Sequence, residues 1–234
     1  INISNGLIDL TGLTFTNGID FTFPETTMLA PGERILVVED ITSFEIAYGL
    51  GLPIAGAFEN NTRLANNGER LTLLARDGST ILDFRFREQH PWPEAPDGTG
   101  RSLVPVIPGN VMSTDPLDWR SSLSPGGTPG WSDTIPFPGG GEETLLTYAL
   151  AGSGTPRIIV ENDIPLLLFR ASTAADHATI WVDFSPDLQN WFPAEPEDFL
   201  SREDQSDGTT TYRFAMPTTQ PLTHHFARLR LETR

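Results

Sequence analysis

The sequence predicts an all-β fold, with two β-sandwich domains joined by a Pro/Gly linker and little helix. Strand-sized segments recur along the whole chain, and turn residues separate them. Residues 124–141 are rich in Pro, Gly and Ser, a composition typical of linkers. We therefore expect a first domain over residues 1–131, a linker over 132–143 and a second domain over 144–234. Trp131 and Phe137 are unusual in a free linker, and we expect them to dock onto a neighbouring surface.

The stretch 20–49 is the most informative part of the first domain. Phe21 and Phe23 are two residues apart, so they share one face of a short strand. Pro31-Gly32 predicts a tight turn, because Pro presets φ and Gly tolerates positive φ. The continuous aliphatic run Ile35–Val38 predicts a central strand that is buried on both faces.

Helix is predicted in two short segments. Thr42–Tyr48 is amphipathic, with Thr42 as its N-cap and Glu45 at its third position. Glu142–Leu150 has leucines at helical spacing and begins the second domain. One further turn is expected over Asp115–Trp119.

The remaining strands are bounded by turn signals. Asp77-Gly78 lies between two apolar runs and predicts a hairpin, and Asp207-Gly208 predicts another turn. The predicted strands are Leu13–Thr16, Ile19–Phe23, Arg34–Val38, Arg70–Ala75, Thr80–Phe86, Ser102–Val106, Arg157–Glu161, Pro165–Ala171, Ala178–Phe184, Thr209–Phe214 and His225–Leu231.

Motifs of the first half follow one another in a recognisable order. They are Asp9–Leu13 (D-L-T-G-L), Asp20–Pro24 (D-F-T-F-P), Leu29–Gly32 (L-A-P-G), Phe44–Gly49 (F-E-I-A-Y-G), Leu64–Leu73 (L-A-N-N-G-E-R-L-T-L) and Gly127–Gly130 (G-T-P-G). This series resembles the lamin-tail domain, an immunoglobulin-like β-sandwich found in nuclear lamins and in many exported bacterial proteins. Leu13 stands where the family has Trp, and the family's opening strand has no counterpart before Ile1-Asn2. The resemblance implies a piece of a longer protein whose first strand is missing from this chain.

The second half carries a further resemblance. Its motifs are Leu145–Leu150 (L-L-T-Y-A-L), Ser185–Trp191 (S-P-D-L-Q-N-W) and Phe226–Arg230 (F-A-R-L-R). They resemble the C-terminal β module of exported proteins from bacteria of the planctomycete–verrucomicrobial kind, although His225 stands where Arg is common. Both resemblances imply an extracellular or cell-surface location.

Composition narrows the classes of function. All fifteen basic residues are Arg, against thirty-one acidic residues, and the net charge of −16 argues against binding to nucleic-acid phosphates. The absence of Cys excludes disulfides, thiolate metal sites and thiol nucleophiles. No apolar run reaches the ~20 residues of a membrane-spanning helix, so no membrane span is predicted.

Histidines are too scattered in the sequence to predict a metal site. The loop His90-Pro91-Trp92-Pro93 has the composition of a sugar or metal site, but we expect Trp92 to pack under the loop. His224 and His225 are adjacent, so in a strand they point to opposite faces and cannot hold one ion together. His177 lies far from both segments in the sequence.

We also predict no cofactor and no catalytic residue, because neither the acidic loops nor the serine-containing loop has a pattern that requires one. The segments Ser113–Trp119 and Glu203–Gly208 supply oxygens for Ca²⁺, but neither has EF-hand spacing. Asx turns explain both loops, with Asp115 as a cap and Asp207-Gly208 as a turn. Ser153 lies in a Gly-rich loop, and the chain has no nucleophile elbow, zinc-protease, P-loop or Rossmann motif.

Four of the tryptophans are candidates for a sugar-binding platform: Trp119, Trp131, Trp181 and Trp191. Trp181 lies on the face of its strand opposite Ile180 and Val182. It is therefore either an exposed contact residue or buried under the helix that begins the second domain, and we expect the second arrangement.

We thus predict a non-catalytic structural or binding module of a larger exported bacterial protein, acting in attachment, display or protein–protein interaction. Its expected partners are other domains of the same parent chain or surface proteins, with recognition by loops and sheet edges. The alternative is a carbohydrate-binding accessory module of an extracellular hydrolase, which would use Trp92, Trp131 or Trp181. A third hypothesis, a hydrolase built on paired acids, requires a cleft that brings two carboxylates together.

Overall fold

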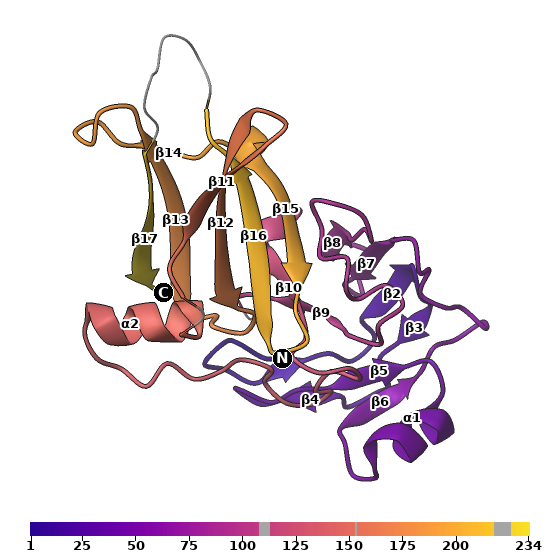
Figure 1. Cartoon of the computed structure of the whole chain (residues 1–234). Coiled ribbons are helices and arrows are strands. Elements are labelled where there is room, and N and C mark those ends of the chain that lie inside the picture. Colours follow the sequence, from indigo (N-terminus) through magenta and orange to yellow (C-terminus); the bar gives the residue numbers. More distant parts are fainter. Residues whose placement is uncertain (108–112, 153, 218–225) are drawn as a thin grey trace. The chain divides into compact units, whose positions relative to one another are not determined.

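The computed structural model describes residues 1–107, 113–152, 154–217 and 226–234. It is an all-β protein with two short α-helices, α1 (Ile41–Tyr48) and α2 (Glu142–Leu150), which confirms the predicted fold class (Figure 1). Contacts divide the chain into two compact units. The N-terminal unit comprises Ile1–Arg120 and Pro125–Asp133, and the C-terminal unit comprises Ser121–Ser124 and Thr134–Arg234. The predicted domain and linker boundaries stay a prediction.

The N-terminal unit is built from short strands in several small sheets. The largest is antiparallel, in the order β3-β2-β7-β8; β1 pairs with β4, β5 with β6 and β9 with β10. The bounds are β1 (Ile8–Asp9), β2 (Thr14–Asn17), β3 (Phe21–Thr22), β4 (Met28–Leu29), β5 (Leu36–Val38), β6 (Ile54–Ala57), β7 (Arg70–Leu74), β8 (Thr80–Arg85), β9 (Leu103–Pro105) and β10 (Trp119–Ser121).

The strand β5 is not the central strand that its aliphatic sequence predicts. It pairs in parallel with β6 and with no other strand of the described residues, and of its three residues Val38 is the one that is fully buried. A parallel pair needs a crossover connection, and α1 supplies it. The N-cap prediction is also wrong: the Asp40 side chain accepts from the Ser43 N–H at 2.7 Å, so the helix begins one residue before Thr42.

Two predicted turns are confirmed in detail. In the first, the Glu33 N–H donates to the Ala30 carbonyl at 3.0 Å, and Gly32 has φ +77, as a type II turn with Pro at its second position requires. In the second, Gly78 has φ +82 and donates to Ala75 at 2.9 Å, which closes the β7–β8 hairpin through a three-residue loop.

A hydrophobic cluster in this unit is centred on Phe84, Trp92 and Trp119. The Trp119 ring stacks on Phe84 with 5.2 Å between centroids, and Trp92 lies 5.9 Å from Trp119. Trp92 is buried, so the prediction that it packs under its loop is confirmed. Burial of a side chain of this size contributes about 2–3 kcal/mol to folding.

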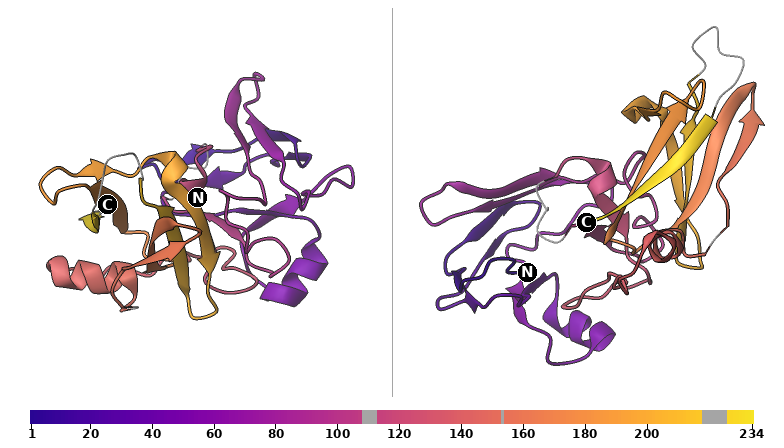
Figure 2. Two further views of the ribbon diagram at one scale, coloured as in Figure 1. Left: turned by 45° about the horizontal axis from the view of Figure 1, so that its top comes forward. Right: turned by 90° about the vertical axis from the view of Figure 1, so that its left-hand side faces the viewer.

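The C-terminal unit is a β-sandwich. One sheet has the order β11-β12-β16-β15 and the other β14-β13-β17 (Figures 1 and 2). Side chains from both sheets share one core, which includes Phe169 and Met216 on one side and Val182 and Phe184 on the other. The bounds are β11 (Arg157–Glu161), β12 (Ile164–Ser172), β13 (Ala178–Ser185), β14 (Phe192–Pro193), β15 (Phe199–Asp204), β16 (Thr209–Ala215) and β17 (Phe226–Thr233), with a 3₁₀ turn at Pro196–Asp198. A further 3₁₀ turn, Pro116–Asp118, belongs to the N-terminal unit.

The segment that precedes α2 is attached to this unit. Phe137 packs against Leu145 and Ala149 of α2, and Tyr148 donates from its hydroxyl to the Ile135 carbonyl at 2.7 Å. Phe137 therefore docks as the sequence predicts, whereas the same prediction is wrong for Trp131, which is mostly exposed. Figure 1 shows α2 lying across one end of the strands of this unit.

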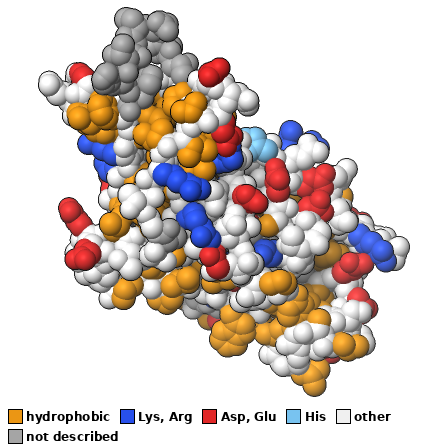
Figure 3. Space-filling view, viewed as in Figure 1, with side chains coloured by type: hydrophobic (Ala, Val, Ile, Leu, Met, Phe, Trp, Pro, Cys, Tyr) orange, Lys and Arg blue, Asp and Glu red, His pale blue; other side chains and the backbone are white. Residues whose placement is uncertain are grey.

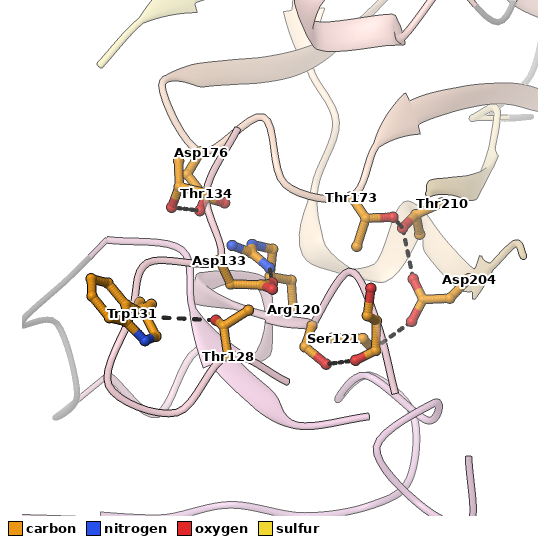
Figure 4. A network of polar contacts seen from close by, with 12 residues as sticks. Arg120, Ser121, Thr128, Trp131, Asp133, Thr134, Thr173, Asp176, Asp204 and Thr210 are labelled. Carbon is orange, nitrogen blue, oxygen red and sulfur yellow. Dashed lines mark hydrogen bonds and ion pairs between the residues drawn. The ribbon is translucent and has the colours of Figure 1, made fainter. Parts of the chain in front are cut away.

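The residues at which the chain passes from one unit to the other make polar contacts within their own unit (Figure 4). Within the N-terminal unit, Arg120 and Asp133 form a buried ion pair at 2.6 Å. Within the C-terminal unit, Asp204 accepts from the hydroxyls of Ser121 and Thr210, and Asp176 accepts from that of Thr134. In the part of the chain that the structure describes, no helix is long and apolar enough to cross a membrane.

Candidate binding face

The outer face of the sheet β14-β13-β17 carries the most distinctive side chains of the C-terminal unit. Alternation along β13 turns Val182 and Phe184 into the core and Trp181 and Asp183 outward. The antiparallel register sets Arg230 directly opposite Trp181. Residues opposite each other share a face, so this pair meets outside the sandwich.

Asp183 is the anchor of this face. Its carboxylate is buried although it lies on the outer side of the sheet. It accepts from the Arg228 Nε at 2.9 Å and from the Arg230 Nε at 3.5 Å. A buried carboxylate needs such partners, and it fixes both guanidinium groups in turn.

Each of these arginines also stacks on an indole ring. The Arg228 guanidinium carbon lies 4.3 Å from the centroid of Trp191, and that of Arg230 lies 5.3 Å from Trp181. Both distances are within the range of cation–π attraction. We call Trp181, Asp183, Trp191, Arg228 and Arg230 the Trp–Arg face.

The Trp–Arg face keeps hydrogen-bonding capacity for a ligand. Arg228 uses Nε for Asp183, and its terminal amino groups have no hydrogen-bond partner among the described residues. Within the same ranges, the Trp181 indole N–H has none either, and 44% of this residue is exposed. Arg230 donates further to Glu232 at 2.5 Å. The face therefore offers donors and aromatic surface that are already held in place.

This arrangement suits recognition of planar or acceptor-rich groups. A guanidinium group presents donors in a fixed fork that matches carboxylates and other oxygen pairs. Tryptophan adds a large rigid surface with one polar edge. Both residue types are enriched among the residues that dominate binding energy at interfaces.

The predicted platform tryptophans are not brought together. Trp119 is buried in the N-terminal unit, whereas Trp131 of the same unit is 73% exposed. Trp181 and Trp191 both belong to the Trp–Arg face, where each stacks with a different arginine. The expected burial of Trp181 under the helix is wrong, because α2 packs Leu145 and Ala149 against Ala178, at the start of β13, and leaves Trp181 uncovered.

The acidic loops have the turn roles that the sequence predicts. Asp115 accepts from the Leu117 N–H at 2.9 Å and caps a 3₁₀ turn. Asp207 accepts from the Thr209 hydroxyl at 2.7 Å, a hydrogen bond that lowers the pKa of this carboxyl. Ser153, His224 and His225 lie outside the described residues, and within these no group of three His, Asp or Glu side chains is placed to hold a metal ion.

The sequence signal for the Trp–Arg face was present but incomplete. The arginines at positions 228 and 230 alternate with Leu229 and Leu231, which indicates an outward row on β17. The sequence alone does not show the strand register, which sets Asp183 opposite Arg228.

The N-terminal unit exposes a separate apolar surface. The helix α1 contributes no fully buried residue. Ile46, within the helix, and Leu50, just after its end, are almost fully exposed. Figure 3 shows hydrophobic side chains gathered at the lower right of this view, over the segment that carries α1 in Figure 1. Tyr48 donates from its hydroxyl to the Gly126 carbonyl at 2.8 Å. Exposed patches of this kind often mark interaction surfaces.

Comparisons of the chain with family models, with curated proteins and with solved structures find no match.

Proposed function

We propose that this chain is a non-catalytic binding module of a larger exported bacterial protein and that it attaches to a surface partner through the Trp–Arg face. The observation that carries the proposal is the free donor capacity of Arg228 beside the exposed ring of Trp181. Trp and Arg together are the side chains most often found at the centre of binding sites.

The preferred partner is a surface protein or another domain of the parent chain. The strongly acidic chain concentrates three of its fifteen arginines at positions 228, 230 and 234. Asp183 and Glu232 bind Arg228 and Arg230 within the chain. It is therefore the remaining N–H donors of Arg228 that favour a partner patch with carboxylates, which match the guanidinium fork. The lamin-tail resemblance of the first half agrees with a role in attachment or display, as an analogy of fold.

A carbohydrate-binding accessory module is the second candidate. It is favoured by the exposure of Trp181 and by its indole N–H, which has no partner among the described residues, since a sugar ring packs on an indole and offers hydroxyl acceptors to its edge. This candidate uses the Trp–Arg face of the C-terminal unit, whereas Trp131, which the sequence also suggests, belongs to the N-terminal unit.

Binding to cell envelopes of the bacterium that encodes the chain tests both candidates. The labelled chain should bind saturably, and the single variants W181A and R228A should each weaken binding at least about tenfold, or about 1.4 kcal/mol. W131A is the matched control, because it removes an even more exposed tryptophan from the other unit.

Treatment of the envelopes separates the two candidates. Loss of binding after protease digestion, with binding retained after periodate oxidation, supports a protein partner, and the reverse result supports a glycan. The proposal is overturned when no saturable binding is found, or when W181A and R228A bind as well as the unaltered chain.

A further inference from the structure

The strand β11 is a free edge of the four-stranded sheet in the C-terminal unit. Among the described residues it pairs with β12 on one side and with no strand on the other, and the right-hand view of Figure 2 shows the β11–β12 hairpin at the margin of this unit. Exposed edges are usually protected by Pro, Lys or a bulge, because unpaired backbone groups recruit other strands. The sequence of β11, R-I-I-V-E, contains no Pro, its charged residues Arg157 and Glu161 lie only at the two ends, and its pairing with β12 runs without a register shift.

The hairpin geometry determines which backbone groups point outward. Val160 lies opposite Pro165, which has no N–H, and the Pro165 carbonyl accepts from the Met216 N–H at 2.9 Å on the side of β16. Val160 therefore does not exchange hydrogen bonds with β12. Orientation alternates along an antiparallel strand, so Ile158 has the same orientation and Ile159 the opposite one. The N–H and C=O groups of Ile158 and Val160 thus face out from the edge.

We propose that β11 pairs with β11 of a second copy of this chain, antiparallel and centred on Ile159. In this register Ile158 lies opposite Val160 of the second copy, and both belong to the outward-facing set. The pairing forms four backbone hydrogen bonds and joins two four-stranded sheets about a two-fold axis. Such self-complementary contacts are typical of symmetric dimers.

The charges at the two ends of β11 match in this register. Arg157 comes to lie opposite Glu161 of the second copy, at both ends of the paired strands. Arg157 is exposed and has no ion-pair partner among the described residues. Glu161 is bound by Arg213 within its own chain, and a carboxylate has the capacity to accept from a second guanidinium.

The other antiparallel registers form fewer backbone hydrogen bonds and match the charges less well. Pairing Ile158 with itself, or Val160 with itself, leaves a single hydrogen-bonded pair and sets Arg157 or Glu161 opposite the apolar Ile159. The proposed register is the one that pairs both outward-facing residues of each strand. It also covers the two most exposed apolar side chains of the edge, Ile158 at 49% and Val160 at 67% exposure.

The interface is small, so the association should be weak. A single strand pair falls in the size class of transient contacts, for which we expect a dissociation constant on the order of 0.1 mM. The inference goes beyond the proposed binding function and does not depend on it, because the Trp–Arg face belongs to the other sheet.

Sedimentation velocity over a concentration series tests the pairing. The unaltered chain should shift from monomer to dimer, and V160P should weaken dimerisation at least tenfold. Proline at position 160 removes an outward-facing N–H and no hydrogen bond to β12, so the hairpin should be retained. I164T is the control, because it alters an exposed residue of the same hairpin that lies on β12.

Charge reversal tests the register without relying on proline. R157E and E161R should each be monomeric, because each sets like charges opposite each other in its homodimer. An equimolar mixture of R157E and E161R should dimerise again, and so should the double variant R157E/E161R. Hydrogen exchange should show the Ile158 and Val160 amides protected at high concentration only, and the Ile159 amide protected at every concentration.

Three results would each overturn the proposal. The first is a chain that stays monomeric to about 1 mM, a concentration well above the expected dissociation constant. The second is a folded V160P, with an unchanged circular dichroism spectrum, that dimerises like the unaltered chain. The third is a mixture of the two charge variants that remains monomeric while the unaltered chain dimerises.

Discussion

Replacement of Asp133 by Ala should destabilise the N-terminal unit strongly. The side chains of Arg120 and Asp133 are only 7% and 4% exposed, and their charged atoms are 2.6 Å apart. Removal of the carboxylate leaves a guanidinium group that is shielded from water. Breaking a buried pair in this way costs about 3–5 kcal/mol.

The expected change in a urea titration follows from this cost. With a denaturant dependence of about 2 kcal/mol per molar urea, the unfolding midpoint should fall by about 1.5–2.5 M. The double variant R120M/D133A should lose less than D133A, because the buried cation is also removed. Fluorine NMR of chains labelled with 5-fluorotryptophan follows the N-terminal unit through the lines of Trp92 and Trp119, which are both buried there.

An exposed ion pair of the same unit provides the control. Glu39 lies 3.0 Å from Arg63, and both side chains are mostly in solvent. Exposed pairs contribute about 0–1 kcal/mol, so E39Q should shift the midpoint by less than about 0.5 M. A shift for D133A as small as that for E39Q would refute the argument from burial.

Two further predictions concern Trp92 and Asp187. W92A should destabilise the N-terminal unit by about 3–5 kcal/mol in the same urea titration, because it empties a core position. It should leave envelope binding unchanged. Lost binding with unchanged stability would instead make Trp92 a ligand residue. The N–H groups of Asn190 and Gln189 lower the pKa of Asp187 to about 2, so the stability that this carboxylate contributes is present above its ordinary pKa of 3.8 and is lost as the pH falls toward 2. Carboxyl NMR should show this titration, D187N should remove the corresponding pH dependence of stability, and a midpoint near 3.8 would contradict the proposed hydrogen bonding.

Local sequence signals predicted the C-terminal unit well. The bounds of α2 and β11 agree with the predicted ones, because apolar spacing and flanking turn residues mark both segments. The strand β15 (Phe199–Asp204) was missed, since most of its residues are polar and only its pairing with β16 makes it a strand. Two-residue strands such as β14 leave no pattern to detect.

Long-range contacts account for the errors at β5 and at Trp181. An aliphatic run indicates burial, but the sequence does not show that, among the described strands, β5 pairs with β6 and its small residues and with no other. Alternation likewise placed Trp181 on the outer face of β13 but did not tell what covers that face. The sequence did not identify Asp183 as a binding-face residue, and the reason is related. Its role depends on the register of β17, which is set by the packing of the sandwich.

Pairing through β11 would change how tightly the module holds a surface. Each copy brings its own Trp–Arg face, and a second binding event on the same surface becomes intramolecular, which raises the apparent affinity by about 10²–10⁴ without any new contact. V160P should therefore weaken binding to intact envelopes while leaving binding to an isolated, solubilised partner unchanged. W181A should weaken both, because it alters the face itself. Equal losses for V160P in the two assays would mean that the edge strand contacts the partner directly, and that two copies do not act together.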